Sequence, residues 1–217
     1  MNLGVIREFD FYPFTLKIPK DWKKIYLSFS QIDPLLRAGK LDATPYIYPS
    51  INFLPGGYKT TSIGVILTEN SRSLVLVSKK DLKELERIYL GLIQGYEQVL
   101  HCIENTLDEI LLGKDFKIRV FTDIFDADAF VIYGDKALRG DFGDYKFVYG
   151  LTKGEVKLAV WVVREDMEEE ILPHLGNSLA HWFMDMGRYV YDYSKRAGLN
   201  FENLLEHAKS LKFNYEG

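Results

Sequence analysis

Ser28–Glu69 reads SFSQIDPLLRAGKLDATPYIYPSINFLPGGYKTTSIGVILTE, and this stretch decides the fold class. Ser30 is positioned to cap a short helix, and residues 41–48 predict the strand that follows it. After the turn at residues 55–57, the run 62–68 is almost continuously apolar, which is typical of a strand in a sheet covered on both faces. Helix and strand signals therefore alternate, and this alternation predicts an α/β protein.

Outside this stretch, the apolar pattern predicts two long helices. Residues 81–112 carry apolar side chains at spacings of three and four, with a break or kink expected at Gly91 or Gly95. Residues 168–196 predict a second amphipathic helix, and Asn200 can cap a short last one. Strands are predicted at 3–6, 24–28, 73–77, 117–121, 129–133 and 156–163, and a further extended segment at 14–18.

Two turn-rich segments suggest how the chain is divided. Residues 69–73 and 146–155 each join strand-rich blocks and carry no helical pattern. We interpret them as two crossings of one hinge. This predicts an outer α/β lobe made of 1–72 and 154–217, and an inserted α/β lobe at 73–153.

Composition excludes several classes of protein. Among 217 residues, 47% are hydrophobic and 27% charged, which is the profile of a folded globular protein, and Cys102 has no second cysteine with which to form a disulfide. The formal charge of −4 argues against a nucleic-acid partner. Arg7, Glu8 and Asp10 interrupt the apolar residues near the N-terminus, which a signal peptide would not tolerate, and no run of about 18 apolar residues suggests a membrane span. We therefore expect a cytoplasmic protein that is not inserted in a membrane.

Motifs of covalent catalysis, nucleotide binding and metal binding are absent: the sequence has no GxSxG, GxGxxG or HExxH. His174, His181 and Asp185 fall on one face of the predicted helix 168–196 and could in principle hold a metal. Because Trp182 and Phe183 flank His181, packing is the better interpretation. We predict neither a metal nor a cofactor.

Small polar residues gather where predicted helices and strands begin. Helix N-termini carry unpaired backbone N–H groups and bind anions, although such residues also serve as simple caps, and both interpretations stay open here. These positions are occupied by Ser28, Ser30, Thr60, Thr61, Ser62 and Ser78.

Three stretches together resemble one known family. Besides Ser28–Glu69, these are DADAFVIYGDKAL at 126–138 and VKLAVWVVRED at 156–166. They are similar to conserved segments of the futalosine-pathway enzymes of menaquinone biosynthesis, the chorismate dehydratase and the enzyme that cleaves cyclic dehypoxanthinylfutalosine. The resemblance implies a periplasmic-binding-protein-like type II fold, with two α/β lobes and a ligand cleft between them.

The sequence departs from this family at several positions that face the cleft in the enzymes. Asp10 stands where the family has Asn, and Phe11 where it has Ser. The Ser/Thr-rich helix start is reduced to Ser78 followed by two lysines, and Tyr133-Gly134-Asp135 replaces the His-Glu pair of the branch that cleaves cyclic dehypoxanthinylfutalosine. The resemblance therefore implies a divergent relative that kept the cleft and changed or lost the reaction.

Three functional hypotheses follow. The first is a small-molecule binding protein that takes a carboxylate-bearing ligand in the interlobe cleft. The alternative is a lyase or hydrolase acting on a chorismate-like or futalosine-like acid, in which Asp10 is the general base if burial raises its pKa, while Ser30, Ser62 and Ser78 hold carboxylates. The third treats the apolar stripe at 82–110 as the seam of a homodimer, although core packing explains the same stripe.

The first hypothesis predicts which residues contact the ligand. Segments far apart in sequence converge if the carboxyl ends of the strands face one crevice, as in other open α/β sheets. Asp10, Tyr46, Ser62, Ser78 and Asp135 are then expected to line one pocket. Further predicted contacts are Tyr12 and Tyr48 as aromatic walls, with Ser30, Ser50, Thr61 and Gly134.

Overall fold

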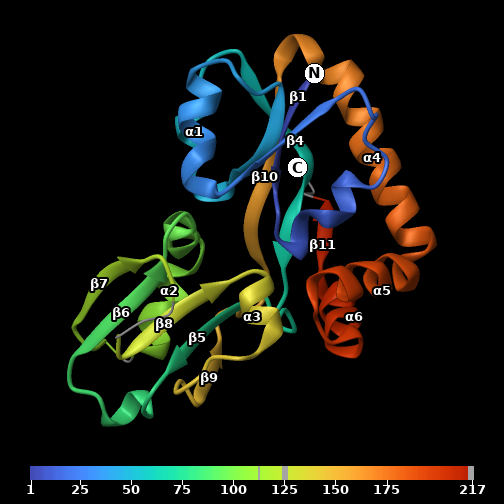
Figure 1. The fold of residues 1–217 in the computed structure, drawn as a ribbon. Helices are drawn as coiled ribbons and strands as arrows, with labels where there is room; N and C mark the ends of the chain where they lie inside the picture. The colour runs from blue at the N-terminus through green and yellow to red at the C-terminus, as the bar shows by residue number, and fades with distance from the viewer. Residues whose placement is uncertain (112, 124–126, 215–217) are drawn as a thin grey trace.

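The computed structural model of the chain describes residues 1–111, 113–123 and 127–214. It contains a six-stranded and a five-stranded β-sheet, each with its own helices (Figure 1). We call the six-stranded sheet and its helices the first lobe, and the five-stranded sheet and its helices the second lobe. The predicted α/β class and the two-lobed organisation are confirmed.

The first lobe is built on a mixed sheet in the strand order β11-β4-β10-β3-β1-β2. Its central strand, β10, is VKLAVWVVR, and the apolar run is buried because both faces are covered. Figure 1 shows α1 on one side of these strands and α4, α5 and α6 on the other. The strands are β1 (Asn2–Ile6), β2 (Lys23–Leu27), β3 (Ala43–Ile47), β4 (Tyr58–Leu67), β10 (Val156–Arg164) and β11 (Lys212–Asn214). The helices are η1 (Phe9–Thr15), α1 (Phe29–Arg37), η2 (Tyr48–Phe53), η5 (Glu165–Met167), α4 (Glu168–Met184), α5 (Met186–Ala197) and α6 (Phe201–Ser210).

The second lobe is built on a sheet in the order β7-β6-β8-β5-β9. Its strands are β5 (Leu74–Ser78), β6 (Ile88–Ile93), β7 (Phe116–Phe121), β8 (Ala129–Tyr133) and β9 (Phe147–Gly150). Its helices are η3 (Leu82–Glu84), η4 (Glu97–Val99), α2 (Leu100–Ile110) and α3 (Asp135–Arg139). The chain enters this sheet between Leu67 and Leu74 and leaves it between Gly150 and Val156. The domain boundaries at 72/73 and 153/154 stay a prediction.

The two lobes meet at the carboxyl ends of parallel strands. β1 and β2 are paired up to Ile6 and Leu27, and β6 and β8 run parallel in the other sheet. The segments that follow these strands touch across the junction, where the Ser30 N–H donates to the Gly95 carbonyl over 3.3 Å. The junction therefore lies where open α/β sheets hold their ligands.

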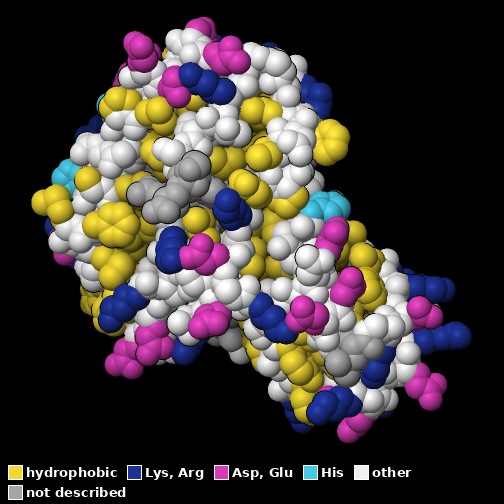
Figure 2. Space-filling view, turned by 180° about the vertical axis from the view of Figure 1, so that it is seen from behind, with side chains coloured by type: hydrophobic (Ala, Val, Ile, Leu, Met, Phe, Trp, Pro, Cys, Tyr) yellow, Lys and Arg dark blue, Asp and Glu magenta, His cyan; other side chains and the backbone are white. Residues whose placement is uncertain are grey.

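The apolar core continues from one lobe into the other. A single cluster of buried residues includes Val160 of β10 and Leu92 of β6, so the lobes pack closely together. Seen from behind, the molecule has a broad first lobe and a narrower second lobe, with Lys/Arg and Asp/Glu side chains intermixed over this face (Figure 2). Among the described residues, no helix is long and apolar enough to cross a membrane.

The helix predicted over 81–112 is wrong. Residues 88–93, IYLGLI, form β6 instead, because they pair with β7 and β8 and bury Leu90 and Leu92 between the neighbouring layers. Only α2 is helical over a substantial length in this region. The homodimer seam along 82–110 therefore loses the continuous helix on which it depended.

Three smaller predictions also change. The helix over 168–196 is two helices, because the backbone at Asp185 leaves the helical conformation with φ −146° and ψ 43°. The extended segment predicted at 14–18 begins inside η1. Ser28, not Ser30, is the residue before α1, and its N–H donates to the Gln31 side chain over 2.9 Å. The Asn200 cap of α6 is confirmed, since its side chain accepts from the Asn203 N–H.

Candidate functional site

Glu8, which follows β1, reaches across the junction into the second lobe. Its carboxyl group accepts the Tyr96 hydroxyl over 2.6 Å and also accepts the Asp135 N–H. Gly134 permits this approach, because it has φ +80° and an added Cβ would lie 2.0 Å from Glu8 Oε2. Burial, followed by the nearby charge of Asp135, raises the pKa of Glu8 to about 7.

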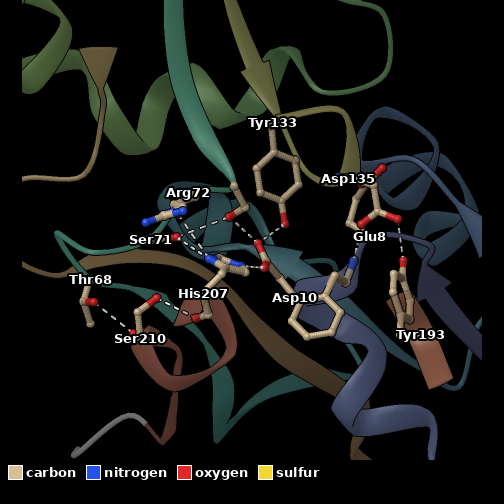
Figure 3. Close-up of polar contacts among 12 residues, drawn as sticks. Glu8, Asp10, Thr68, Ser71, Arg72, Tyr133, Asp135, Tyr193, His207 and Ser210 are labelled. Atoms are coloured by element: carbon tan, nitrogen blue, oxygen red, sulfur yellow. Dashed lines mark hydrogen bonds and ion pairs between the residues drawn. The ribbon is translucent and has the colours of Figure 1, made fainter. Parts of the chain in front are cut away.

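Asp135 makes the reciprocal contact from the second lobe. Its Oδ1 accepts the Phe9 N–H over 2.9 Å, and its Oδ2 accepts the Tyr193 hydroxyl over 2.6 Å. Burial raises the pKa of the Asp135 carboxyl, although these two hydrogen bonds partly oppose the effect. Glu8 and Asp135 therefore tie the lobes together from both sides (Figure 3).

Asp10 lies at the centre of a fully buried cluster beside this junction. Its Oδ2 accepts the hydroxyls of Ser73 and Tyr133, over 2.8 and 2.9 Å. Its Oδ1 lies 2.6 Å from His207 Nε2 (Figure 3). Asp10 and His207 are both 0% exposed. A buried carboxylate is tolerated only when it is paired and hydrogen-bonded, and three donors meet that requirement here.

The backbone decides which ring nitrogen of His207 carries a proton. The Arg72 N–H donates to Nδ1 over 3.2 Å, so Nδ1 is an acceptor and the proton resides on Nε2. Nε2–H then donates to Asp10 Oδ1 over 2.6 Å. The Ser71 hydroxyl lies 3.4 Å from the same Nδ1.

The role of general base predicted for Asp10 gains no support from this arrangement and stays a prediction. The side chain has no exposed surface, and its two oxygens already accept three protein donors, so a ligand proton cannot reach it. Ser71, His207 and Asp10 resemble a nucleophile, base and acid in order. However, Ser71 is 5% exposed and the Arg72 N–H occupies the nitrogen that would have to take its proton.

An open pocket of about 900 Å³ lies next to Asp135, between β1, β2, η1 and α5. Its walls combine the three cationic side chains Arg7, Lys24 and Arg196 with four tyrosines. Asp135 is the second-lobe residue in these walls. The others are Val5, Ile6, Tyr12, Thr15, Leu16, Tyr26, Tyr189, Asp192, Tyr193 and Ala197.

The cations of this pocket rest on its aromatic rings. The Arg196 guanidinium lies 5.2 Å from the ring centre of Tyr12 and 4.9 Å from that of Tyr193, and Arg7 lies 4.9 Å from Tyr26. Lys24 Nζ donates to the Thr15 carbonyl, and burial lowers the pKa of its amine. The three cations outnumber the two carboxyl groups of the walls, Asp135 and Asp192, so positive charge lies beside aromatic ring faces.

The structure brings some of the predicted ligand contacts together. Tyr12 and Asp135 line the pocket together, and Gly134 is adjacent. Tyr46, in contrast, is not among the residues that line the pocket. It is buried, and its hydroxyl donates to Asp33 over 2.9 Å. Burial and this bond raise the Tyr46 pKa to about 12.

The predicted grouping of Ser78 with Asp135 is wrong. Ser78 pairs with Ala129 at the start of β8, whereas Leu74 pairs with Tyr133 at its end, close to Asp135. Antiparallel pairing thus places Ser78 at the opposite end of the sheet, where its hydroxyl donates to the Lys80 carbonyl.

The remaining predicted contacts also lie outside the pocket walls. Thr61 and Ser62 lie in β4, where Ser62 is exposed and the Thr61 hydroxyl bonds to Ile63. Ser30 lies at the start of α1 facing Gly95, and its hydroxyl is 3.2 Å from that of Ser28. Tyr48 and Ser50 lie in η2, after β3.

Sequence reasoning missed the cations and the α5 tyrosines of the pocket. Tyr189, Tyr193 and Arg196 are spaced by four and three residues, which places them on one face of α5. This spacing could have indicated a shared face of a helix, but the sequence analysis treated 168–196 as a single helix and did not consider this face separately. Arg7 and Lys24 gave no such signal, since each lies in or after a different strand.

No protein-family model matches the sequence, and no curated protein matches it. Solved structures do resemble it. Protein AF1704 from Archaeoglobus fulgidus matches with TM-score 0.71 at 13% identity, over 96% of this chain and 86% of that one. The Candida albicans CA3427 gene product, described as having the generic periplasmic binding protein fold, matches with TM-score 0.69 at 12% identity, over 99% and 81%.

The alkanesulfonate-binding protein SsuA from Xanthomonas axonopodis pv. citri, bound to MOPS, matches with TM-score 0.65 at 11% identity, over 98% of this chain and 86% of that one. At these identities the likeness shows the fold alone. The chain has the two-lobed periplasmic-binding-protein-like fold, as predicted. The link to menaquinone biosynthesis stays a hypothesis.

Proposed function

We propose that this protein binds a small carboxylate-bearing organic molecule in the open pocket beside Asp135. One observation carries the proposal: Arg7, Lys24 and Arg196 converge on a space of about 900 Å³ that is walled by tyrosines. Ligand pockets typically have this size, with aromatic walls and a few placed polar groups. Guanidinium groups suit carboxylates because they can donate two parallel hydrogen bonds.

The position of the pocket supports the same function. Most of its wall belongs to the first lobe, but Asp135 comes from the second, so the complete pocket exists only when the lobes are together. An aromatic ring can rest against Tyr12 or Tyr26, while its carboxylate meets a cation. Among the structural neighbours, the alkanesulfonate-binding protein bound to MOPS is an example of this fold holding an organic anion.

The alternative of a lyase or hydrolase has less support. Asp10, the general base in this alternative, already accepts hydrogen bonds from three protein donors. The serines assigned to the substrate carboxylates, Ser30, Ser62 and Ser78, are spread over both lobes, outside the pocket walls.

Isothermal titration and thermal unfolding with benzoate, phenylacetate and succinate test the proposal, with neutral benzamide as the chemical control. A ligand at a hundredfold excess over its Kd stabilises the folded protein by about 2.7 kcal/mol. Arg196→Gln is expected to weaken binding at least tenfold. Lys195→Gln changes the neighbouring cation, which lies over Tyr191 outside the pocket, and is expected to bind as wild type does. Equal binding by both variants, or no stabilisation by any of the acids, contradicts the proposal.

A further inference from the structure

The buried cluster around Asp10 joins three parts of the molecule that must move if the lobes separate. Asp10 comes from η1 and His207 from α6, both in the first lobe. Ser73 lies in the segment that crosses between the lobes, and Tyr133 ends β8 in the second lobe. One carboxylate therefore receives hydrogen bonds from both lobes and from the crossing between them.

We propose that Asp10 and His207 are positioning residues, which form a latch that holds the second lobe against the first and keeps Asp135 in the pocket wall. Tyr133 lies two residues before Asp135, so fixing its hydroxyl fixes the end of β8 from which Asp135 enters the pocket. The effect on ligand affinity rests on the proposed function. The latch between the lobes does not depend on the proposed function.

Opening the lobes breaks a hydrogen bond of the buried cluster and therefore costs free energy. Separation removes the Tyr133 hydroxyl from Asp10 Oδ2, so the carboxyl group loses one of its three protein donors. His207 cannot turn to compensate, because the Arg72 N–H holds its Nδ1 and directs Nε2–H at Asp10. The donors are therefore oriented before the lobes meet, and closing them completes the set.

The chain carries its own probe of lobe separation. Cys102 is its single cysteine, and it lies in α2 of the second lobe. Its Sγ is 3.7 Å from the Leu158 carbonyl of β10 in the first lobe. The Cys102 side chain is partly exposed, but its Sγ faces β10 and burial raises the pKa of the thiol to about 12. A thiol reagent is therefore expected to react slowly while α2 packs on β10 and faster when α2 moves away.

Tyr133→Phe, compared with Tyr145→Phe, tests the latch. Both remove a buried hydroxyl of the second lobe, but the Tyr145 hydroxyl bonds to Ala127 within that lobe. With Ellman's reagent at pH 8 and no denaturant, Tyr133→Phe is expected to raise the Cys102 labelling rate at least tenfold. Tyr145→Phe should change the rate less than threefold. Equal rates in the two variants overturn the latch.

A pair of His207 variants separates positioning from packing. The amide of His207→Gln can donate to Asp10 and accept from the Arg72 N–H, so its labelling rate is expected near that of wild type. His207→Leu fills the space without donating and should label as fast as Tyr133→Phe. If Leu and Gln label equally, the latch is contradicted. Benzoate titration reports separately on the pocket, since Arg196→Gln should lose benzoate binding without changing Cys102 labelling.

Discussion

Glu8 and Tyr96 meet across the two lobes, with the Tyr96 hydroxyl donating to Glu8 Oε1 over 2.6 Å. Glu8 follows β1 of the first lobe, whereas Tyr96 follows β6 of the second. Burial and the charge of Asp135 both disfavour the ionised form of Glu8, and its pKa rises from 4.5 to about 7. Around neutral pH both protonation states of Glu8 are therefore populated.

The raised pKa predicts a pH dependence of stability. Between pH 4.5 and pH 7 the folded protein binds more protons at Glu8 than the unfolded chain does, so the contribution of Glu8 to the free energy of unfolding falls as the pH rises. Its full size is on the order of 3 kcal/mol, present below pH 4.5 and lost as the pH passes about 7. Urea unfolding of wild type and Glu8→Gln at pH 5, 6, 7 and 8 measures it. The variant should become more stable relative to wild type as the pH rises, and parallel curves would contradict the prediction.

We predict that Gly91→Ala disturbs the packing of the second lobe. It pairs with Phe130 across β6 and β8, and an added Cβ would lie 2.2 Å from the Phe130 ring. That ring is buried and packs against Phe121 and Tyr145, so moving it aside disturbs both contacts. Gly91→Ala is therefore expected to lower the free energy of unfolding by about 1–3 kcal/mol.

Gly176 supplies the opposite case for the same chemical change. It lies in α4 with nothing within 4 Å of an added Cβ, so Gly176→Ala should stabilise the protein by about 0.5–1 kcal/mol through helix propensity. Urea unfolding of both variants measures the two effects. Two changes of the same sign would show that packing at Gly91 does not decide the outcome.

Strands whose apolar residues are contiguous were predictable from sequence. β8 was predicted at its observed bounds, and β5 was predicted one residue early. Both are fully buried, so every position is apolar or small and the run stands out from its surroundings. β6 was not predictable in the same way, because its apolar residues also fit a helical stripe. Pairing with β7 and β8, which come later in the chain, selects the strand.

The candidate site was less predictable than the fold. Asp10 and His207 are 197 residues apart, and their contact depends on how α6 packs near η1. Neither residue spacing nor local propensity predicts a contact between residues so far apart in the sequence. Tyr12 and Asp135 were predicted as ligand contacts, but Arg196 enters the same pocket only because α5 is a separate helix that turns back at Asp185.

Tyr193 is predicted to couple the pocket to the second lobe. Its hydroxyl donates to Asp135 Oδ2, so Tyr193→Phe leaves this mostly buried carboxylate with one donor fewer. We expect the free energy of unfolding to fall by about 1–3 kcal/mol, and benzoate binding to weaken. Tyr191→Phe, on the same helix but 49% exposed, should change either quantity little. The same loss in both variants would show that the bond to Asp135 is not responsible.

Gly134 and Gly140 together isolate the contact between Glu8 and the second lobe. Both have positive φ, but Gly134, with φ +80° and ψ −149°, lies in a region almost restricted to glycine, whereas Gly140, with φ +71° and ψ 8°, is left-handed helical, so the backbone strain of Gly→Ala is larger at Gly134. An added Cβ at Gly134 would lie 2.0 Å from Glu8 Oε2 and 2.3 Å from its Cδ, whereas at Gly140 it would meet nothing within 4 Å. Gly134→Ala must displace the Glu8 side chain, which then loses its bonds to Tyr96 and the Asp135 N–H.

We therefore expect Gly134→Ala to lower the free energy of unfolding by at least about 1–3 kcal/mol more than Gly140→Ala does, because it adds a steric clash and broken hydrogen bonds to the larger backbone strain. The pH dependence supplies a second readout. Once Glu8 is displaced towards water its pKa should return towards 4.5, so the loss of stability expected for wild type between pH 5 and 7 should shrink in Gly134→Ala and persist in Gly140→Ala. Urea unfolding of both variants at pH 5 and pH 7 measures both effects. Equal losses and equal pH dependence in the two variants would mean that Glu8 does not hold the lobes together through this contact.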